Sequence, residues 1–298
     1  MQGEPSRAAR PPRWMRRDTW ARPLGLVYGV TAFAGTWIFF AWFVVFLGNF
    51  PKRSSPWLET TVDTGATVEP LTATLVNFVL ISLFCLQHSL MARPWFKRML
   101  ARSIPPALER ATYVHAANLT GMLFLFFWQP IPIPLWTFDS DLLEGLIWCA
   151  FGAGWLILLS AALSMDIWEL LGLRQAWSWF RRRPHAPLML KTSWLYRYLE
   201  HPMYVGVALG IWMTPHMTVG HALLASVLTL YIAIGMSYER RDLQARFGAS
   251  YRRWRTDRDG ARVGVFVHSA VANELKRRLD HITREPLPAR MADLLYKI

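Results

Sequence analysis

The stretch from Leu195 to Gly206 reads LYRYLEHPMYVG and joins a charged, aromatic cluster directly to an apolar run. The apolar run is expected to lie in lipid, where polar and ionisable groups are costly. Groups placed at such a boundary indicate a functional site at the mouth of a membrane helix. The polar members of the cluster are Tyr196, Tyr198, Glu200, His201 and Tyr204.

The composition of the whole chain indicates the same environment. Hydrophobic residues make up 53% of the 298 residues, tryptophan occurs 16 times, and the formal net charge is +13. A membrane protein with basic cytoplasmic loops explains all three features together. Nucleic-acid binding is disfavoured because the Lys and Arg residues lie between long apolar runs. Cys85 and Cys149 lack metal-ligand spacing, so neither a metal site nor a disulfide is predicted.

Six apolar runs are expected to cross the bilayer, although the shorter ones are marginal in length. The last two form a helical hairpin, joined by an external turn at Thr214–His221. Basic residues gather in alternate loops, which places both termini in the cytoplasm by the positive-inside rule. The predicted fold is therefore an all-α integral membrane bundle of about six transmembrane helices. The six runs are Leu24–Gly48, Leu71–Met91, Thr112–Trp128, Leu142–Met165, Met203–Met213 and Leu223–Ser237.

Three parts of the chain are distinguished by composition. Residues 1–22 form a basic cytoplasmic arm, residues 23–255 the transmembrane domain, and residues 256–298 a cytoplasmic amphipathic tail. Within the second part, Asp166–Glu200 is rich in Trp and Arg, which favours a helical segment lying in the cytoplasmic interface. The tail is expected to pack on the protein or on anionic headgroups, with a membrane protein partner as the alternative.

The hairpin and its flanks resemble the isoprenylcysteine carboxyl methyltransferase superfamily of integral membrane enzymes. The matching residues are HPMYVG at His201–Gly206, Glu239 after the hairpin, and FGASY at Phe247–Tyr251. A closer resemblance is to the bacterial methanethiol S-methyltransferase branch, and it runs from the first apolar run to Trp254. Further stretches that carry it are Gln87–Lys97, Glu109–Tyr113, Leu171–Gln175 and Trp212–His221.

This resemblance implies a multi-pass enzyme of the bacterial inner membrane. In that branch a methyl group moves from S-adenosylmethionine to a small thiol such as methanethiol, giving dimethyl sulfide without a metal. The thiol must lose its proton, so a base or a cation near it is expected. The sulfonium of the donor favours acidic and aromatic side chains. Expected catalytic residues are His201, Glu239, Arg240 and Arg197; expected cofactor-binding residues are Gln175, Tyr196, Tyr198, Leu199, His201, Tyr204 and Glu239.

Two positions depart from the pattern of the superfamily. Glu200 stands where an arginine usually precedes His-Pro, and Arg240 stands where a second glutamate usually follows Glu239. Because the charges are exchanged, we expect Glu200 and Arg240 to form an ion pair across the pocket mouth. The departures also favour an alternative, a non-catalytic assembly or regulatory subunit that keeps the fold. A relative of the membrane sterol reductases is disfavoured because nothing indicates a sterol-sized cavity.

Overall fold

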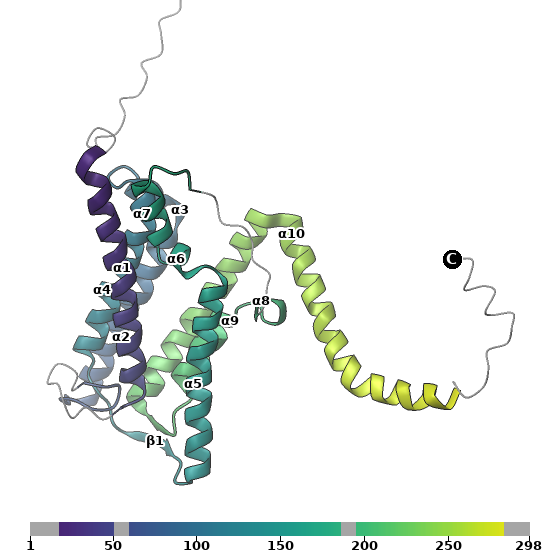
Figure 1. Ribbon diagram of the computed structural model, residues 1–298. Helices are drawn as coiled ribbons and strands as arrows, with labels where there is room; N and C mark the ends of the chain where they lie inside the picture. Colours follow the sequence, from purple (N-terminus) through teal and green to yellow (C-terminus); the bar gives the residue numbers. More distant parts are fainter. Residues whose placement is uncertain (1–17, 51–59, 186–194, 283–298) are drawn as a thin grey trace, which may run out of the picture.

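A computed structural model describes residues 18–50, 60–185 and 195–282, and in these ranges the chain is mainly helical (Figure 1). Ten α-helices, one 3₁₀ helix and two short strands are present in the described ranges. The elements in chain order are α1 (Asp18–Leu47), α2 (Pro70–Ala92), α3 (Pro94–Leu100), η3 (Pro106–Leu108), α4 (Glu109–Phe127), β1 (Pro134–Thr137), α5 (Asp141–Ser164), α6 (Ile167–Leu170), α7 (Leu173–Phe180), α8 (Leu195–Tyr198), α9 (Pro202–Trp212), β2 (His216–Thr218) and α10 (Val219–Ile282).

The predicted all-α membrane fold is confirmed. Four helical segments are long and apolar enough to cross a membrane. The α9 helix is apolar but shorter, and α4 carries several polar residues, so the expected number of six spans stays a prediction. The four segments are Trp20–Leu47, Pro70–Ala92, Asp141–Ser164 and Val219–Ala245.

The polar residues of α4 bind the neighbouring helices. Asn118 donates to the Ala32 carbonyl of α1 at 3.0 Å and accepts from Thr36 Oγ1 at 3.2 Å. Thr120 Oγ1 donates to Gln87 Oε1 of α2 at 3.3 Å. Hydrogen bonds between helices satisfy polar groups that hydrocarbon could not. These bonds hold α1, α2 and α4 together and explain why α4 can be less apolar than the other long helices.

The second half of the bundle forms by close approach of α5 and α9. A Cβ added at Gly206 would lie 2.6 Å from the Gly154 carbonyl oxygen, and one added at Gly154 would lie 2.7 Å from the Gly210 nitrogen. Small residues at such an interface let two helix backbones touch, which is a common basis of helix pairing in membranes. The α10 helix packs beside α9 and α2, so the predicted hairpin is present.

One end of the bundle holds an unpredicted two-stranded sheet (Figure 1). Strand β1 pairs antiparallel with β2, and Thr137 lies opposite His216. The Asp63 carboxylate accepts hydrogen bonds from Asn49 Nδ2 and Thr218 Oγ1. These bonds attach the loop between α1 and α2, which contains Asp63, to strand β2. The interpretation of Thr214–His221 as a simple turn was therefore incomplete, because pairing with a distant loop extends its backbone.

The opposite end carries α3 and α7, with α6 next to them (Figure 1). The α6 and α7 helices belong to the segment Asp166–Glu200, which is expected to lie in the interface. A break at Gly172, with φ +87°, separates α6 from α7. A Cβ at Gly172 would lie 2.7 Å from the Ala111 nitrogen, so glycine is required by both its backbone and its neighbour. The α10 helix bends at Gly248, with φ 48° and ψ −114°, and then leaves the bundle.

The predictions about the N-terminal arm and the C-terminal tail stay untested. Most of the basic arm, residues 1–17, lies outside the described ranges, as do the side chains of the tail that were expected to form an apolar face. The division at residues 22 and 255 stays a prediction.

Candidate active site

His201 occupies the N-cap position of α9, and Pro202 begins the helix, a position where its missing N–H costs nothing. The hairpin brings α10 back beside this end. As a result, His201 Nδ1 lies 3.3 Å from Glu239 Oε2, and its Nε2 lies 3.7 Å from Glu200 Oε1. The His201 side chain is only 8% exposed. One imidazole thus lies between two carboxylates at the mouth of a membrane helix.

The expected ion pair between Glu200 and Arg240 is present. Arg240 Nε donates to Glu200 Oε1 at 3.2 Å, and Arg240 Nη2 donates to Oε2 at 3.3 Å. The hydroxyl of Tyr251 donates to Oε1 at 2.7 Å. Such a fork-to-fork arrangement is the strongest geometry available to an arginine and a carboxylate. The negative charge of Glu200 is therefore neutralised by Arg240, although the Glu200 side chain is only 10% exposed.

Tyr251 is buried beneath this pair. Burial raises the pKa of Tyr251 to about 12, and its hydrogen bond to Glu200 together with the Glu200 charge act in the same direction. A phenol with a raised pKa stays protonated near neutral pH and can donate a hydrogen bond throughout that range. The pair and the phenol therefore join the HPMYVG and FGASY motifs, which lie on either side of the hairpin.

A polar cavity of about 400 Å³ opens beside these residues. It lies between α2, α4, α9 and α10, and Asp242 at its edge is exposed. A site of this volume is typical of small-molecule binding. Its charged and polar lining consists of His88, Ser89, Arg93, Arg110, Tyr113, Tyr204, Tyr231, Tyr238, Glu239 and Asp242.

A second cavity, of about 230 Å³, lies within the bundle and shares Tyr204 and Tyr231 with the first. Its lining surface is entirely apolar, including the parts of the two tyrosines that face it, and also includes Phe84, Trp155 and Leu228. An apolar cavity of this kind stays dry and accepts small apolar molecules. The two tyrosines therefore mark a boundary between a charged compartment and an apolar one.

Three of the sequence-predicted residues come together here. The rings of His201 and Tyr204 lie 5.4 Å apart, and Tyr204 and Glu239 both line the polar cavity. The Tyr196 hydroxyl donates to the sulfur of Met165; burial raises its pKa, and the nearby Glu239 charge acts the same way. Arg240 meets Glu200 at the rim.

Three other sequence-predicted residues, Tyr198, Leu199 and Gln175, are placed differently. Tyr198 is 55% exposed, and Leu199 beside it is half-buried. The side chain of Arg197 lies outside the described residues. Gln175 lines neither of the two cavities.

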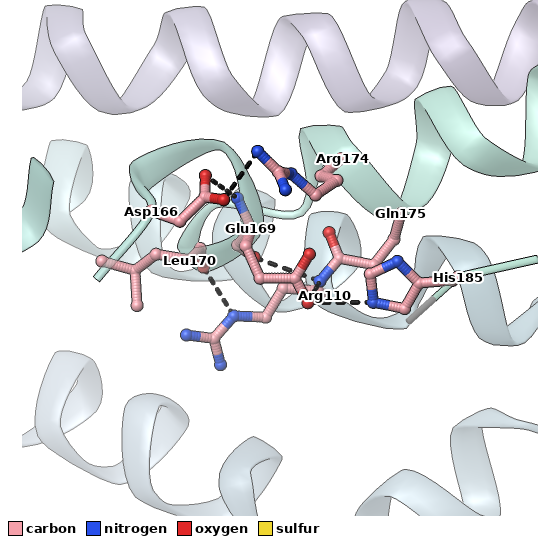
Figure 2. A network of polar contacts seen from close by, with 7 residues as sticks. All are labelled: Arg110, Asp166, Glu169, Leu170, Arg174, Gln175 and His185. Atoms are coloured by element: carbon pink, nitrogen blue, oxygen red, sulfur yellow. Dashed lines mark hydrogen bonds and ion pairs between the residues drawn. The ribbon is translucent and has the colours of Figure 1, made fainter. Parts of the chain in front are cut away.

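Gln175 instead belongs to a polar network that holds the turn between α6 and α7 (Figure 2). Its Nε2 donates to the Glu169 carbonyl at 3.1 Å and to Glu169 Oε1 at 2.9 Å. His185 Nε2 lies 2.9 Å from the same oxygen, and the Arg174 guanidinium lies 2.6 Å from the Asp166 carboxylate. Glu169 is only 5% exposed, and the contacts to its Oε1 offset in part the cost of a buried acid whose Oε2 has no hydrogen-bond partner among the described residues. The network supports the fold of this turn.

Several lining residues escaped the sequence-based interpretation. Arg110 and Tyr113 lie one turn apart at the start of α4, and Tyr231 interrupts an apolar run. Polar groups at membrane depth were the available signal. Nothing local, however, indicates that α4 and α10 face one cavity.

Comparison with known proteins identifies the family. No family model matches the chain, and no solved structure matches it. The chain is similar to the methanethiol S-methyltransferase of Crocosphaera subtropica, with 37% identity over 235 residues that cover 79% of this chain and 90% of that protein.

Two further relatives show the same likeness. The methanethiol S-methyltransferase 2 of Bradyrhizobium diazoefficiens is 38% identical over 238 residues, 79% of this chain and 88% of that protein. The methanethiol S-methyltransferase of Mycobacterium tuberculosis is 33% identical over 236 residues, 79% of this chain and 94% of that protein. Likeness of this extent means that the chain belongs to the methanethiol S-methyltransferase family.

Proposed function

We propose that this protein is a membrane methyltransferase that converts methanethiol to dimethyl sulfide with S-adenosylmethionine as the methyl donor. The observation that carries the proposal is the shared wall of the two cavities, where Tyr204 and Tyr231 line both. A charged compartment suits a polar, cationic donor, and the apolar one suits a small alkyl thiol. The names of the relatives support the choice of thiol.

The residues of the polar cavity fit such a donor. Glu239 lines the polar cavity, and its Oε2 lies 3.3 Å from His201 Nδ1, so a carboxylate held by the imidazole is within reach of a cation in that cavity. Tyr113, Tyr204 and Tyr231 offer aromatic faces, which also attract a cation. When bound, the donor would supply an electrophilic methyl group on a sulfonium. The protein would hold that charge between Glu239 and the tyrosines and keep it away from bulk water.

The thiol would lie with its methyl group in the apolar cavity and its sulfur at the tyrosine boundary. Fixing the two reactants against the same two tyrosines, where the two cavities adjoin, removes most of the entropic cost of their encounter. An apolar surrounding also strips water from the sulfur and makes the thiolate more reactive. His201, held by two carboxylates, would position Glu239 rather than contact the thiol.

The alternative of a non-catalytic assembly or regulatory subunit is not favoured. It was based on the exchanged charges at Glu200 and Arg240, yet the two residues compensate each other in a bidentate pair. The exchange therefore leaves a neutralised rim. Four of the sequence-predicted residues, Arg197, Arg240, Tyr196 and Tyr198, would contribute to binding at this rim. A direct contact between Gln175 and the donor is not proposed.

We further propose that both termini lie in the cytoplasm of a bacterial inner membrane. The end of the bundle that bears α3 and α7 is rich in basic residues, among them Lys97, Arg98 and Arg181. Positive charge of this kind favours the cytoplasmic side and binds anionic headgroups. A partner for the tail remains part of this proposal.

One experiment tests the function with a matched pair of variants. The full chain in nanodiscs is titrated with S-adenosylmethionine by calorimetry, and dimethyl sulfide released from methanethiol is measured by headspace gas chromatography. We expect binding and turnover in the wild type, a large loss in Glu239→Gln, and little change in Glu144→Gln, since Glu144 is 40% exposed, close to the 41% of Glu239, and lines neither cavity. Donor binding without turnover of methanethiol would assign another acceptor, and absence of donor binding would refute the proposal.

A further inference from the structure

Arg110 carries a positive charge into the wall of the polar cavity from the first turn of α4. Its Nε donates to the Leu170 carbonyl at 2.7 Å, and its guanidinium lies 5.1 Å from the ring centroid of Tyr113. Two contacts on different sides fix the group in place. In Figure 2 the terminal nitrogens of Arg110 point away from the network around Glu169. The guanidinium is therefore oriented before any ligand binds.

Two acids near Arg110, Glu169 in space and Glu109 in sequence, are engaged with other partners, while Glu239 and Asp242 line the same cavity without an ion pair to Arg110. Glu169 binds Gln175 and His185, as described above. Glu109, the preceding residue in the chain, forms an ion pair with Lys97 at 3.1 Å. Among the described residues, no carboxylate lies within ion-pair distance of Arg110. By contrast, Arg240 at the rim of the site is neutralised by Glu200.

A half-buried cation without a counter-charge is costly in a membrane protein. The cost is removed when an anion enters the cavity and accepts hydrogen bonds from the two terminal nitrogens. Glu239 lines the same cavity from α10, so a ligand that carries both an anionic and a cationic group would find a partner for each.

We propose that Arg110 is the anion-binding residue of the polar cavity and holds an anionic group of a reactant. The inference rests on the proposed function, and two reactants can supply the anion. The donor carries a carboxylate, which suits the planar fork of a guanidinium. The acceptor can be bound as a thiolate, with its proton released to water at the cavity mouth and its electron pair kept on sulfur.

Arg93 provides a matched control because it lines the same cavity. Its guanidinium lies over the ring of Tyr238, 4.4 Å from the centroid, and Tyr238 is 43% exposed. Arg93 is half-buried, as Arg110 is, but its guanidinium makes no hydrogen bond to another described residue. Loss of its charge therefore removes a cation from the same cavity without removing a guanidinium that a backbone carbonyl holds in place.

The experiment compares Arg110→Gln, Arg110→Lys and Arg93→Gln in full-length protein in nanodiscs, with folding checked by thermal melting. Calorimetry measures the affinity for S-adenosylhomocysteine, which has the carboxylate, and for 5′-methylthioadenosine, which lacks it. Turnover is measured with ethanethiol and with 2,2,2-trifluoroethanethiol, a thiol of much lower pKa. Wild-type protein that neither binds nor turns over these compounds would refute the proposed function itself, without reference to Arg110.

If the donor carboxylate is the anion, Arg110→Gln weakens S-adenosylhomocysteine about tenfold or more and leaves 5′-methylthioadenosine unchanged. If the thiolate is the anion, both affinities stay, and kcat/KM falls about tenfold more for ethanethiol than for the trifluoro compound. Arg110→Lys, which keeps the charge, shows the same pattern with a smaller loss, and it replaces Arg110→Gln if that variant does not fold. Equal effects of Arg110→Gln and Arg93→Gln, or no effect, would overturn the inference.

Discussion

The guanidinium of Arg240 binds both carboxylate oxygens of Glu200, at 3.2 and 3.3 Å. The two residues are 40 positions apart and lie on opposite sides of the hairpin formed by α9 and α10. Their contact closes the polar end of this hairpin directly beside His201.

Removing one member of the pair should be worse than exchanging both. Glu200→Gln leaves Arg240 and Tyr251 without their anionic partner, and we expect a loss of about 1–3 kcal/mol in stability, limited by the exposure of Arg240. The double variant Glu200→Arg/Arg240→Glu restores the order usual in the superfamily and should recover most of the loss. Thermal melting of both single variants and the double variant gives the coupling energy. Additive effects would show that the pair does not stabilise the hairpin.

The bond from Tyr251 to Glu200 should contribute stability only while the phenol is protonated. The pKa of Tyr251 is raised by burial to about 12, above the ordinary tyrosine value of about 10. A raised pKa means that the contribution is complete below about pH 10 and is lost as the pH rises towards 12. Tyr251→Phe should therefore cost about 1 kcal/mol from pH 7 to 9 and less at higher pH. A melting series across this range checks the sign; a difference that grows with pH would contradict it.

Filling the apolar cavity should impair thiol binding without affecting the donor. Leu228 lines this cavity and is 8% exposed, whereas Leu230 on the same helix is 63% exposed. We expect Leu228→Trp to raise KM for methanethiol about tenfold or more, while Leu230→Trp stays near wild type. Affinity for S-adenosylhomocysteine should be unchanged in both. If Leu228→Trp weakened the donor analogue instead, the assignment of the two cavities would be wrong.

The α5 helix should tolerate an added methyl group at Gly152 but not at Gly154, where it contacts α9. A Cβ at Gly154 would lie 2.7 Å from backbone of α9, whereas a Cβ at Gly152 would meet nothing within 4 Å. Gly154→Ala is expected to cost about 1–3 kcal/mol through overpacking. Gly152→Ala should be neutral or slightly stabilising, because alanine favours a helix over glycine. Equal melting temperatures for the two variants would rule out the close contact.

The membrane fold and the polar end of the hairpin could be predicted from the sequence because their signals are local. Long apolar runs indicate the helices directly. Glu200 and Arg240 flank the two arms of one hairpin, so their meeting follows from connectivity once the arms are placed. The expectation that His201, Tyr204 and Glu239 lie close together follows from the same connectivity.

Features that depend on contacts between distant segments could not be predicted. Strands β1 and β2 are too short to show an alternating pattern, and they pair only because two loops meet at one end of the bundle. The contacts of Gln175 could not be predicted because its partners come from two segments: Glu169 precedes the turn at Gly172, and His185 follows α7. Arg110 faces the cavity across from α10, more than a hundred residues away.

The most direct test of the central claim is transfer of a labelled methyl group. Full-length protein in nanodiscs is incubated with S-adenosylmethionine that carries a deuterated methyl group and with unlabelled methanethiol, and the headspace is analysed by mass spectrometry. The proposal predicts dimethyl sulfide with one deuterated and one ordinary methyl group, formed by wild type and strongly reduced in Glu239→Gln. Folded, donor-binding protein that releases no labelled dimethyl sulfide would contradict it.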